Sequence, residues 1–287
     1  MPEPACDDHL PDHAARLRDA AGFVFDMDGT IALGDAKSGG HKALPHAVAL
    51  LETLERRGIP FVVFTNGTAK APADYAASLR AAGFPVSDAQ MLTPSASAAA
   101  WFVAQGMRRV RVLGNAGCAA PLRAAGLEVI DPTAPAQDVE AVYTGWFREF
   151  DFAALEAACD SLWHGARLFT ASNVPFFATA TGRAIGSSFA INAMLTAMTG
   201  KRARILGKPS RVALDVARQV MGLPRSAVRQ MVVVGDDPAL EMRMANAAGA
   251  LAVGLTTGLM QSTTDLPARD TPAVLLTGLE PVLAALG

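Results

Sequence analysis

Four short segments of this chain place carboxylate, hydroxyl and ammonium groups directly after apolar runs. In chain order they are Asp-Met-Asp-Gly-Thr at 26–30, Thr-Asn-Gly at 65–67, Gly-Lys-Pro at 207–209 and Gly-Asp-Asp at 235–237. Two carboxylates as close as Asp26 and Asp28 repel each other unless a proton or a cation joins them. Hydroxyls, main-chain amides, a lysine and a hard cation together can hold and neutralise phosphoryl oxygens. The set therefore indicates phosphoryl transfer.

Each segment also has an ordinary structural explanation when it is taken alone. Asp28-Gly29 is a common turn, and Thr65-Asn66 can be one too. A single lysine such as Lys208 is mostly a solvated surface charge. Aspartates after a strand can cap the next helix, and Asp237 can do only that. Four such segments, each supplying a different part of one site, make coincidence improbable.

The apolar runs before these segments have the composition of buried strands, at 23–25, 59–64, 204–206 and 231–234. Helical patterns alternate with them at 45–57, 71–82, 210–221 and 238–249, and further strands follow at 251–255 and 273–276. This alternation predicts an α/β fold with a doubly wound, mainly parallel sheet. In such sheets ligands bind beyond the carboxyl ends of the strands, where these segments would lie.

A second α/β series occupies the middle of the chain. Strands are expected at 110–113, 127–130, 139–144 and 167–170, helices at 95–104, 119–125 and 151–163, and a loop entering a helix at 185–198. Because the chemistry-bearing strands lie on both sides of this series, we expect an inserted domain at 100–203. Residues 1–99 and 204–287 would then form the catalytic core domain.

Composition excludes several classes of function. The chain has 287 residues, is 51% apolar and carries a formal net charge of −2, which leaves no basic footprint for nucleic acid and no polybasic membrane signal. We expect that the segment 1–10 is not a signal peptide, because it has neither a basic start nor an apolar run, and no apolar run in the chain is long enough to span a membrane. Cys6, Cys118 and Cys159 fit neither a disulfide framework nor zinc spacing. We expect a cytoplasmic protein.

The order of the four segments resembles that of the haloacid dehalogenase superfamily of phosphohydrolases. The long α/β insertion after Thr65 resembles the class whose cap follows the second motif, and within it the nitrophenylphosphatase, phosphoglycolate phosphatase and pyridoxal phosphatase subgroup. The resemblance covers residues 20–287. Its motifs are specific for the superfamily and weak for the substrate. It implies an α/β cap at 100–203, and caps of this class commonly pair in homodimers.

The resemblance implies a role for each matching residue. Asp26 would be the nucleophile that forms an aspartyl-phosphate, and Asp28 would protonate the leaving oxygen and then activate water. Thr65 and Lys208 would hold the phosphoryl group, and Asp236 would bind Mg²⁺ with Asp26 and the main-chain carbonyl of Asp28. The substrate-binding candidates are Gly29, Thr30, Asn66, Gly67, Asn173, Phe176 and Arg183. A carboxylate nucleophile divides one difficult displacement into two, and oxygen ligands suit Mg²⁺.

Two departures from the family pattern leave the small phosphorylated substrate unassigned. Glu241 stands where a second aspartate is common, and it could reach the metal shell through water or face solvent. The cap stretch Ser172-Asn173-Val174-Pro175 lacks the acid of the family's Thr-Asn-Pro-Asp.

The loop 173–186 is expected to hang over the catalytic aspartates. Its Phe176 and Phe177 would face the substrate or the cap core, and Arg183 would read an anionic part of the leaving group. A phosphatase is the first interpretation. A phosphomutase of the same superfamily and a non-catalytic sensor of a phosphorylated ligand are the alternatives. Asp28 disfavours both the sensor and a dehalogenase, because pure binding needs no acid and a halide leaves without a proton.

Overall fold

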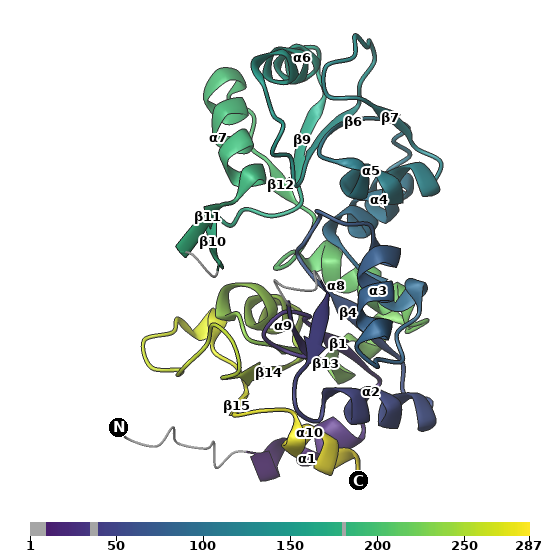
Figure 1. The fold of residues 1–287 in the computed structure, drawn as a ribbon, viewed down its shortest axis with the longest axis vertical. Coiled ribbons are helices and arrows are strands. Elements are labelled where there is room, and N and C mark those ends of the chain that lie inside the picture. Colours follow the sequence, from purple (N-terminus) through teal and green to yellow (C-terminus); the bar gives the residue numbers. More distant parts are fainter. Residues whose placement is uncertain (1–9, 35–39, 180–181) are drawn as a thin grey trace. The chain divides into compact units, whose positions relative to one another are not determined.

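The computed structural model describes residues 10–34, 40–179 and 182–287, and its chain divides into two compact units (Figure 1). The unit called here the core unit comprises residues up to Thr65, 73–92 and 214–287. The inserted unit comprises 66–72 and 93–213. The predicted α/β fold with an inserted α/β cap is confirmed. The predicted domain limits at 100 and 203 stay a prediction.

Six parallel strands form the sheet of the core unit, in the order β15-β14-β13-β1-β4-β5. Their bounds are β1 Gly22–Phe25, β4 Phe61–Phe64, β5 Met91–Leu92, β13 Met231–Gly235, β14 Leu251–Leu255 and β15 Val274–Leu276. Every residue of β1, β4, β13 and β14 is buried, as in a sheet with both faces covered. Phe25 pairs with Val63 and with Val234, so the chain leaves three neighbouring strands at about the same level.

The helices of this part of the chain are α1 Leu10–Arg18, α2 Ala47–Arg56, α3 Pro72–Ala81, α8 Arg211–Val220, α9 Arg243–Ala248 and α10 Glu280–Leu286. In α2 the predicted apolar face, with Leu50, Leu51 and Leu54, is fully buried in the core. That helix ends where Gly58 adopts a positive φ of 67°. Helix α9 is preceded by a π-helical turn at Pro238–Met242, where a regular helix was expected.

The inserted unit contains five parallel strands in the order β12-β9-β8-β6-β7. They are β6 Arg109–Leu113, β7 Glu128–Ile130, β8 Ala141–Thr144, β9 Arg167–Thr170 and β12 Arg204–Ile205. Helices α4 Pro94–Ala104 and α5 Ala116–Ala124 pack on one face of this sheet, in a core cluster with Val110, Val112 and Tyr143. Helices α6 Phe152–Trp163 and α7 Ser187–Thr199 pack on the other, with Leu113, Val142 and Leu168.

Two antiparallel hairpins were not expected from the sequence. The first joins β2 Ala32–Gly34 to β3 His41–Ala43 just after Gly29-Thr30. The second joins β10 Phe176–Thr179 to β11 Gly182–Ile185, where only a loop was predicted before α7. Their strands have only three or four residues, and β3 and β11 each contain a basic residue, so neither hairpin shows two apolar runs joined by a short turn.

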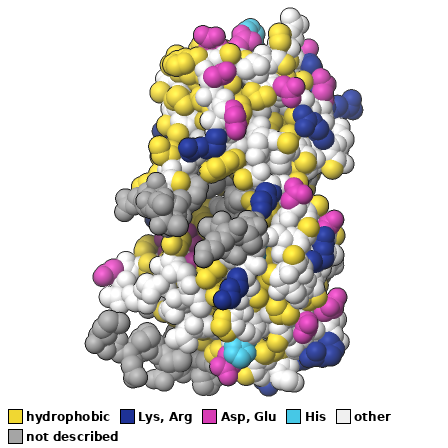
Figure 2. Space-filling model, in the orientation of Figure 1, with side chains coloured by type: hydrophobic (Ala, Val, Ile, Leu, Met, Phe, Trp, Pro, Cys, Tyr) yellow, Lys and Arg dark blue, Asp and Glu magenta, His cyan; other side chains and the backbone are white. Residues whose placement is uncertain are grey.

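Surface and cysteine features complete the description. On the face shown in Figure 2, basic and acidic side chains are interspersed. No helix among the described residues is long and apolar enough to cross a membrane. Cys118 and Cys159 are free thiols, and burial raises the pKa of Cys118 to about 11. Cys6 lies outside the described residues.

Candidate functional site

Two buried carboxylates meet at the carboxyl ends of neighbouring strands. Asp26 follows β1 and Asp236 follows β13, and both are more than nine-tenths buried. The hydroxyl of Thr30 lies 3.2 Å from Asp26 Oδ2 and 3.4 Å from Asp236 Oδ1. A hydroxyl has one proton, so it can donate to only one of these carboxylates at a time. Two carboxylates within reach of one hydroxyl repel each other when both are ionised, and a cation between them would remove that repulsion.

Glycines bring two loops against the carboxyl group of Asp236. Gly29 has a φ of +82°, and a Cβ there would lie 2.6 Å from Asp236 Oδ2. A Cβ at Gly258, in the loop after β14, would lie 2.6 Å from the carboxyl carbon. The N–H of Leu259 donates to Asp236 Oδ2 over 2.8 Å, and the Thr257 hydroxyl donates to the carbonyl of Gly29. The Asp236 side chain is therefore held in place from both sides.

The loop 256–259 is a part of this site that the sequence interpretation missed. Its signal was present, because the apolar strand 251–255 is followed by Thr-Thr-Gly and so ends like the other motif strands. It carries no charged side chain, and its contribution comes through main-chain atoms and one hydroxyl. A search for charged residues after apolar strands therefore does not find the loop 256–259.

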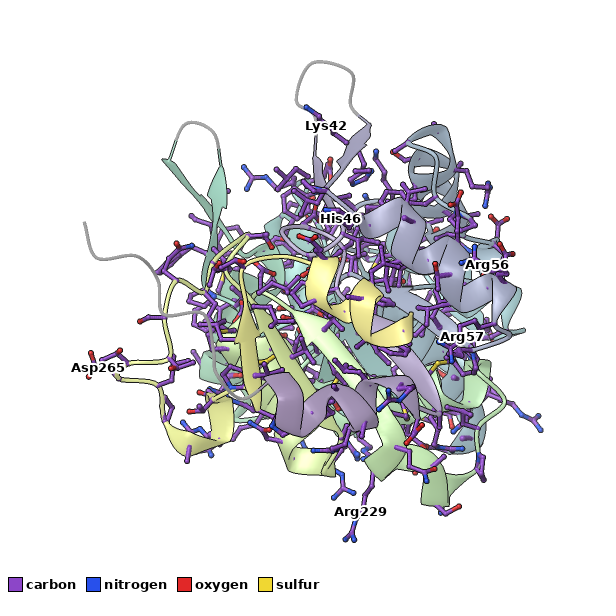
Figure 3. The ribbon with its side chains drawn as sticks, turned by 90° about the horizontal axis from the view of Figure 1, so that it is seen from below. Lys42, His46, Arg56, Arg57, Arg229 and Asp265 are labelled. Carbon is purple, nitrogen blue, oxygen red and sulfur yellow. The ribbon has the colours of Figure 1, made fainter. Side chains whose placement is uncertain are left out.

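Asp28 has a different environment from the buried pair. Its side chain is 57% exposed, and its Oδ1 lies 3.9 Å from Nε2 of His41 on β3. The other ring nitrogen of His41 is 2.8 Å from the hydroxyl of Ser78, so the imidazole is held in one orientation. The next residue on the hairpin, Lys42, is exposed (Figure 3). Asp28 and Asp26 therefore differ in exposure, and the roles predicted for them stay predictions.

Asp237 and Glu241 are held by the helix start that follows β13. Asp237 caps the π-helical turn by accepting from the N–H of Ala239 over 2.8 Å. Glu241 is 1% exposed, and its Oε2 accepts from the N–H of Asp237 over 3.1 Å. The sequence left open whether Glu241 faces solvent or reaches toward the metal site, and its burial shows that the solvent-facing alternative is wrong. A Cβ at Gly235 would lie 2.6 Å from Cβ of Glu241, so the strand end needs glycine there.

Thr65 directly follows β4 in the core unit, whereas Asn66, Gly67 and Lys208 belong to the inserted unit. Thr65 is buried, and its N–H donates to the carbonyl of Leu92 over 3.2 Å. Lys208 is 1% exposed, so it is not the solvated surface charge that a single lysine usually is. Asn66 makes two hydrogen bonds to the main chain of Lys208. The roles of these four residues toward a substrate stay predictions.

The predicted substrate loop of the inserted unit is only partly described. Asn173 is exposed, and Phe176 is 47% exposed on β10 opposite Ile185. Phe176 therefore does not belong to the buried core of the inserted unit. The side chains of Phe177 and Arg183 lie outside the described part of the chain. Their predicted contacts with the substrate stay predictions.

The oxygen groups at the strand ends fit a hard divalent cation. Among the described residues no group of three His, Cys, Asp or Glu side chains gathers as a metal site. The expected ligand set has only two side chains, Asp26 and Asp236, and its third member is the main-chain carbonyl of Asp28. Both side chains are carboxylates brought near one hydroxyl, which suits Mg²⁺ better than a softer metal.

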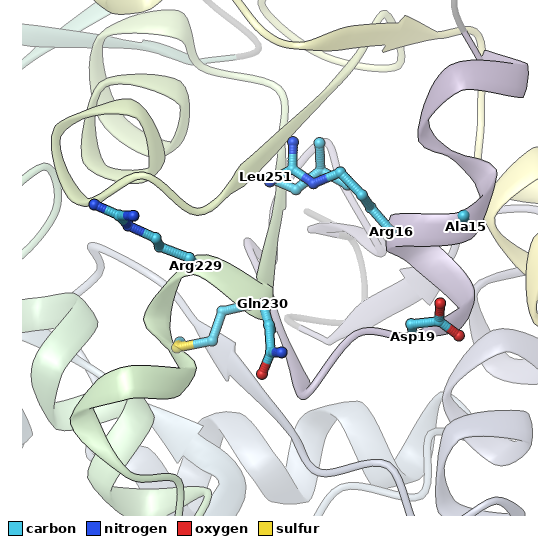
Figure 4. Close-up of a pocket in the computed structure, with 7 residues that line it drawn as sticks. Ala15, Arg16, Asp19, Arg229, Gln230 and Leu251 are labelled. Carbon is cyan, nitrogen blue, oxygen red and sulfur yellow. The ribbon is translucent and has the colours of Figure 1, made fainter.

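A small pocket of about 190 Å³ lies at the opposite ends of the core strands from Asp26 and Asp236 (Figure 4). It is lined by Ala15, Arg16, Asp19, Arg229, Gln230, Met231 and Leu251. Met231 and Leu251 begin β13 and β14, so this pocket is at the amino ends of the strands. It is therefore separate from the carboxyl ends where Asp26 and Asp236 lie.

The chain is similar in sequence to known hydrolases over the segments that carry the motifs. Two family models match, one described as haloacid dehalogenase-like hydrolase over residues 23–128 and one for similar hydrolases over 205–281. Human chronophin is 33% identical over 212 residues, which cover 68% of this chain and 70% of chronophin.

Solved structures are similar over nearly the whole chain. The 4-nitrophenylphosphatase of Thermotoga maritima has a TM-score of 0.79 and 26% identity, with coverage of 95% of this chain and 99% of its own. A glycerol phosphate phosphatase of Mycobacterium tuberculosis, solved in complex with magnesium, has a TM-score of 0.79 and 23% identity. The matched part is 93% of this chain and 77% of the phosphatase chain. This likeness supports the fold.

Proposed function

This chain belongs to the haloacid dehalogenase-like hydrolases and is a phosphoric monoester hydrolase, and from that premise we propose that it is a Mg²⁺-dependent phosphatase acting through an aspartyl-phosphate on Asp26. The single observation that carries the proposal is the pair of buried carboxylates, Asp26 and Asp236, at adjacent strand ends. Burying two like charges together is costly unless a cation compensates them. A phosphatase of this mechanism requires that arrangement.

The proposed reaction has two displacements at phosphorus. In the first, a carboxylate oxygen of Asp26 bonds to phosphorus while the bond from phosphorus to the ester oxygen breaks, and Asp28 gives its proton to that oxygen. In the second, Asp28 takes a proton from water as the water oxygen attacks phosphorus. The bond between phosphorus and Asp26 breaks, which releases inorganic phosphate and regenerates the Asp26 carboxylate. The exposure of Asp28 supports its role, because a proton carrier has to reach both the alcohol and the water.

Mg²⁺ would be held by Asp26, Asp236 and the main-chain carbonyl of Asp28, and when bound it would supply positive charge against the phosphoryl oxygens. Thr65 and Lys208 would bind those oxygens, together with main-chain N–H groups of 66–67, and Gly29 and Thr30 would lie beside the phosphoryl group. The hydrogen bond from Leu259 and the close approach of Gly29 and Gly258 hold the Asp236 carboxylate in one orientation. Orientation before the substrate arrives lowers the barrier, because little reorganisation is left for the reaction itself.

The substrate class we propose is a small phosphate monoester, selected by the loop 173–186. Phe176 would pack on an apolar part of the leaving group, which its 47% exposure supports. Arg183 would bind an anionic part. A screen of phosphate release over a panel of phosphorylated metabolites would identify the substrate. The cytoplasmic location predicted from the sequence stays a prediction.

We also propose that the protein is a homodimer through its inserted unit. Helix α7 has no charged residue, and its Met194 and Met198 are exposed. An uncharged apolar face can meet its own copy without electrostatic repulsion. Light scattering during size-exclusion chromatography would give the mass, and a monomer at micromolar concentration would contradict this part of the proposal.

The test of the function is phosphate release from p-nitrophenyl phosphate. The purified chain should turn over in the presence of Mg²⁺, lose activity in EDTA and regain it when excess Mg²⁺ is added. Asp26→Asn, which is nearly isosteric, should abolish turnover and leave the melting temperature within a few degrees. Activity of this variant within tenfold of the parent would refute the assignment of the nucleophile. An inactive parent with bound Mg²⁺ would favour the non-catalytic sensor.

A further inference from the structure

Asn66 and Lys208 are 142 residues apart in the chain, and a pair of hydrogen bonds joins them. The N–H of Lys208 donates to Oδ1 of Asn66 over 2.9 Å, and Nδ2 of Asn66 donates to the carbonyl of Lys208 over 3.0 Å. One side-chain amide therefore binds both main-chain groups of a single residue, as a neighbouring strand would in a sheet. Neither bond involves the ammonium group of Lys208, so the interaction fixes the lysine's main chain.

Asn66 can approach Lys208 closely because the residue before the lysine, Gly207, has no side chain. A Cβ at Gly207 would lie 2.8 Å from Oδ1 of Asn66 and 2.7 Å from a ring carbon of Pro94. The N–H of Gly207 donates to the carbonyl of Ala171, and its own carbonyl accepts from the N–H of Ser210. The segment Gly207-Lys208 is thus confined on several sides, and the amide of Asn66 forms one of them.

The segment that carries Asn66 is itself fixed within the inserted unit. The hydroxyl of Thr68 accepts from the N–H of Trp146 over 2.9 Å. The side chain of Asn115 donates to the carbonyl of Ala69 over 2.8 Å. A Cβ at Gly117 would lie 2.6 Å from the carbonyl carbon of Lys70, so the helix α5 start is pressed against the same segment. The main chain that carries Asn66 is therefore held in place by the rest of the inserted unit.

The position of the Lys208 ammonium group depends strongly on how well its main chain is fixed. Its side chain is fully buried, and a lysine has four rotatable bonds between Cα and the ammonium group. The position of a buried ammonium is determined only if its Cα is fixed, and a misplacement of about 1 Å at a reacting centre can cost about 100-fold in rate. Fixing the main chain of Lys208 thus fixes the end of its side chain.

We infer that Asn66 is a positioning residue, whose side chain acts on the reaction only through Lys208 by holding its main chain at both hydrogen-bonding groups. The inference rests on the proposed phosphatase function. It gives the Asn66 side chain a role other than direct binding of the phosphoryl group. The main-chain N–H of Asn66 can still bind that group.

A double-mutant cycle separates positioning from direct binding. The four proteins are the parent, Asn66→Ala, Lys208→Ala and the double variant, and the readouts are kcat/KM for p-nitrophenyl phosphate and the inhibition constant of inorganic phosphate. We expect Asn66→Ala to lower kcat/KM by roughly 10- to 100-fold, and to change it by less than about threefold when Lys208 is already alanine. Phosphate inhibition should weaken in the same pattern.

The matched control is Asn246→Ala. Asn246 also holds a loop through its side-chain amide, by donating to the carbonyls of Arg269 and Thr271. This control should lower the melting temperature and leave kcat/KM within about twofold, because it removes a similar amide clamp away from the site. If Asn66→Ala does not fold, Asn66→Asp replaces it in the cycle, since aspartate keeps the acceptor for the Lys208 N–H.

Three results would overturn the inference. Losses that add in the double variant would mean that Asn66 touches the phosphoryl group itself. A kcat/KM of Asn66→Ala within twofold of the parent would mean that the clamp has no effect on the reaction. An inactive parent would overturn the proposed function, and the inference would fall with it. In an active enzyme, additive losses would overturn the positioning role alone.

Discussion

Replacing Gly258 by alanine tests whether the orientation of Asp236 controls the activity. The new Cβ would lie 2.6 Å from the carboxyl carbon of Asp236, whereas two carbon atoms in contact are about 3.5 Å apart or more. Either the carboxyl group or the loop 256–259 then moves by about 1 Å. The aspartate shares the Thr30 hydroxyl with Asp26, so its movement would disturb the geometry of both carboxylates.

We expect Gly258→Ala to lower kcat by about 100-fold or more, which corresponds to about 2.7 kcal/mol of barrier. The concentration of Mg²⁺ needed for half-maximal activity should rise as well. The assay is phosphate release from p-nitrophenyl phosphate over a Mg²⁺ series, with the melting temperature measured in parallel. The hydrogen bond from Leu259 to Asp236 can weaken in this variant, so we expect a loss of stability of about 1 kcal/mol.

The matched control is Gly278→Ala in the same unit. A Cβ at Gly278 has no atom within 4 Å, and its main chain is not in the left-handed region. This control should keep both kcat and the Mg²⁺ dependence of the parent. Our account of Asp236 would be refuted if Gly258→Ala kept kcat within threefold and needed no more Mg²⁺ than the control.

Three further predictions address other residues. Asp236→Ala should weaken the Mg²⁺ dependence far more than Asp237→Ala, because Asp237 caps a helix turn, and a titration with Mg²⁺ that found the reverse would move the metal ligand by one residue. Arg183→Ala should raise KM for the physiological substrate and barely change turnover of p-nitrophenyl phosphate, and equal losses of kcat for both would contradict its role in selection. Arg111→Met should destabilise the inserted unit by about 3 kcal/mol, measured by urea unfolding, since it removes the guanidinium group that donates to three main-chain carbonyls.

The sequence predicted those elements whose signal is a buried apolar run or a helical face. β1, β13 and β14 were found because their residues are apolar throughout and lie inside a covered sheet. Helix α2 was found from its leucines and the glycine after it. The α/β class followed from the order of these elements.

Hydrogen bonds between distant segments could not be predicted in the same way. The contact of His41 with Asp28 depends on the β2–β3 hairpin, whose short strands lack a strong pattern. The amide of Asn66 meets Lys208 only after the inserted unit has folded. Arg111 lies between two valines of strand β6, and its burial depends on carbonyls of 131–134 and the hydroxyl of Ser161. Such partners become visible only in three dimensions.

The division between the two units has a consequence for anyone who exchanges modules among enzymes of this type. The boundary passes between Thr65 and Asn66, so the inserted unit consists of a seven-residue segment, 66–72, as well as 93–213. A chimera that transplants only the long segment would separate Asn115 and Trp146 from their partners at Ala69 and Thr68, and Lys208 from Asn66. Grafts should therefore carry both segments from the same donor, and libraries of recombined caps should place their first crossover before residue 66.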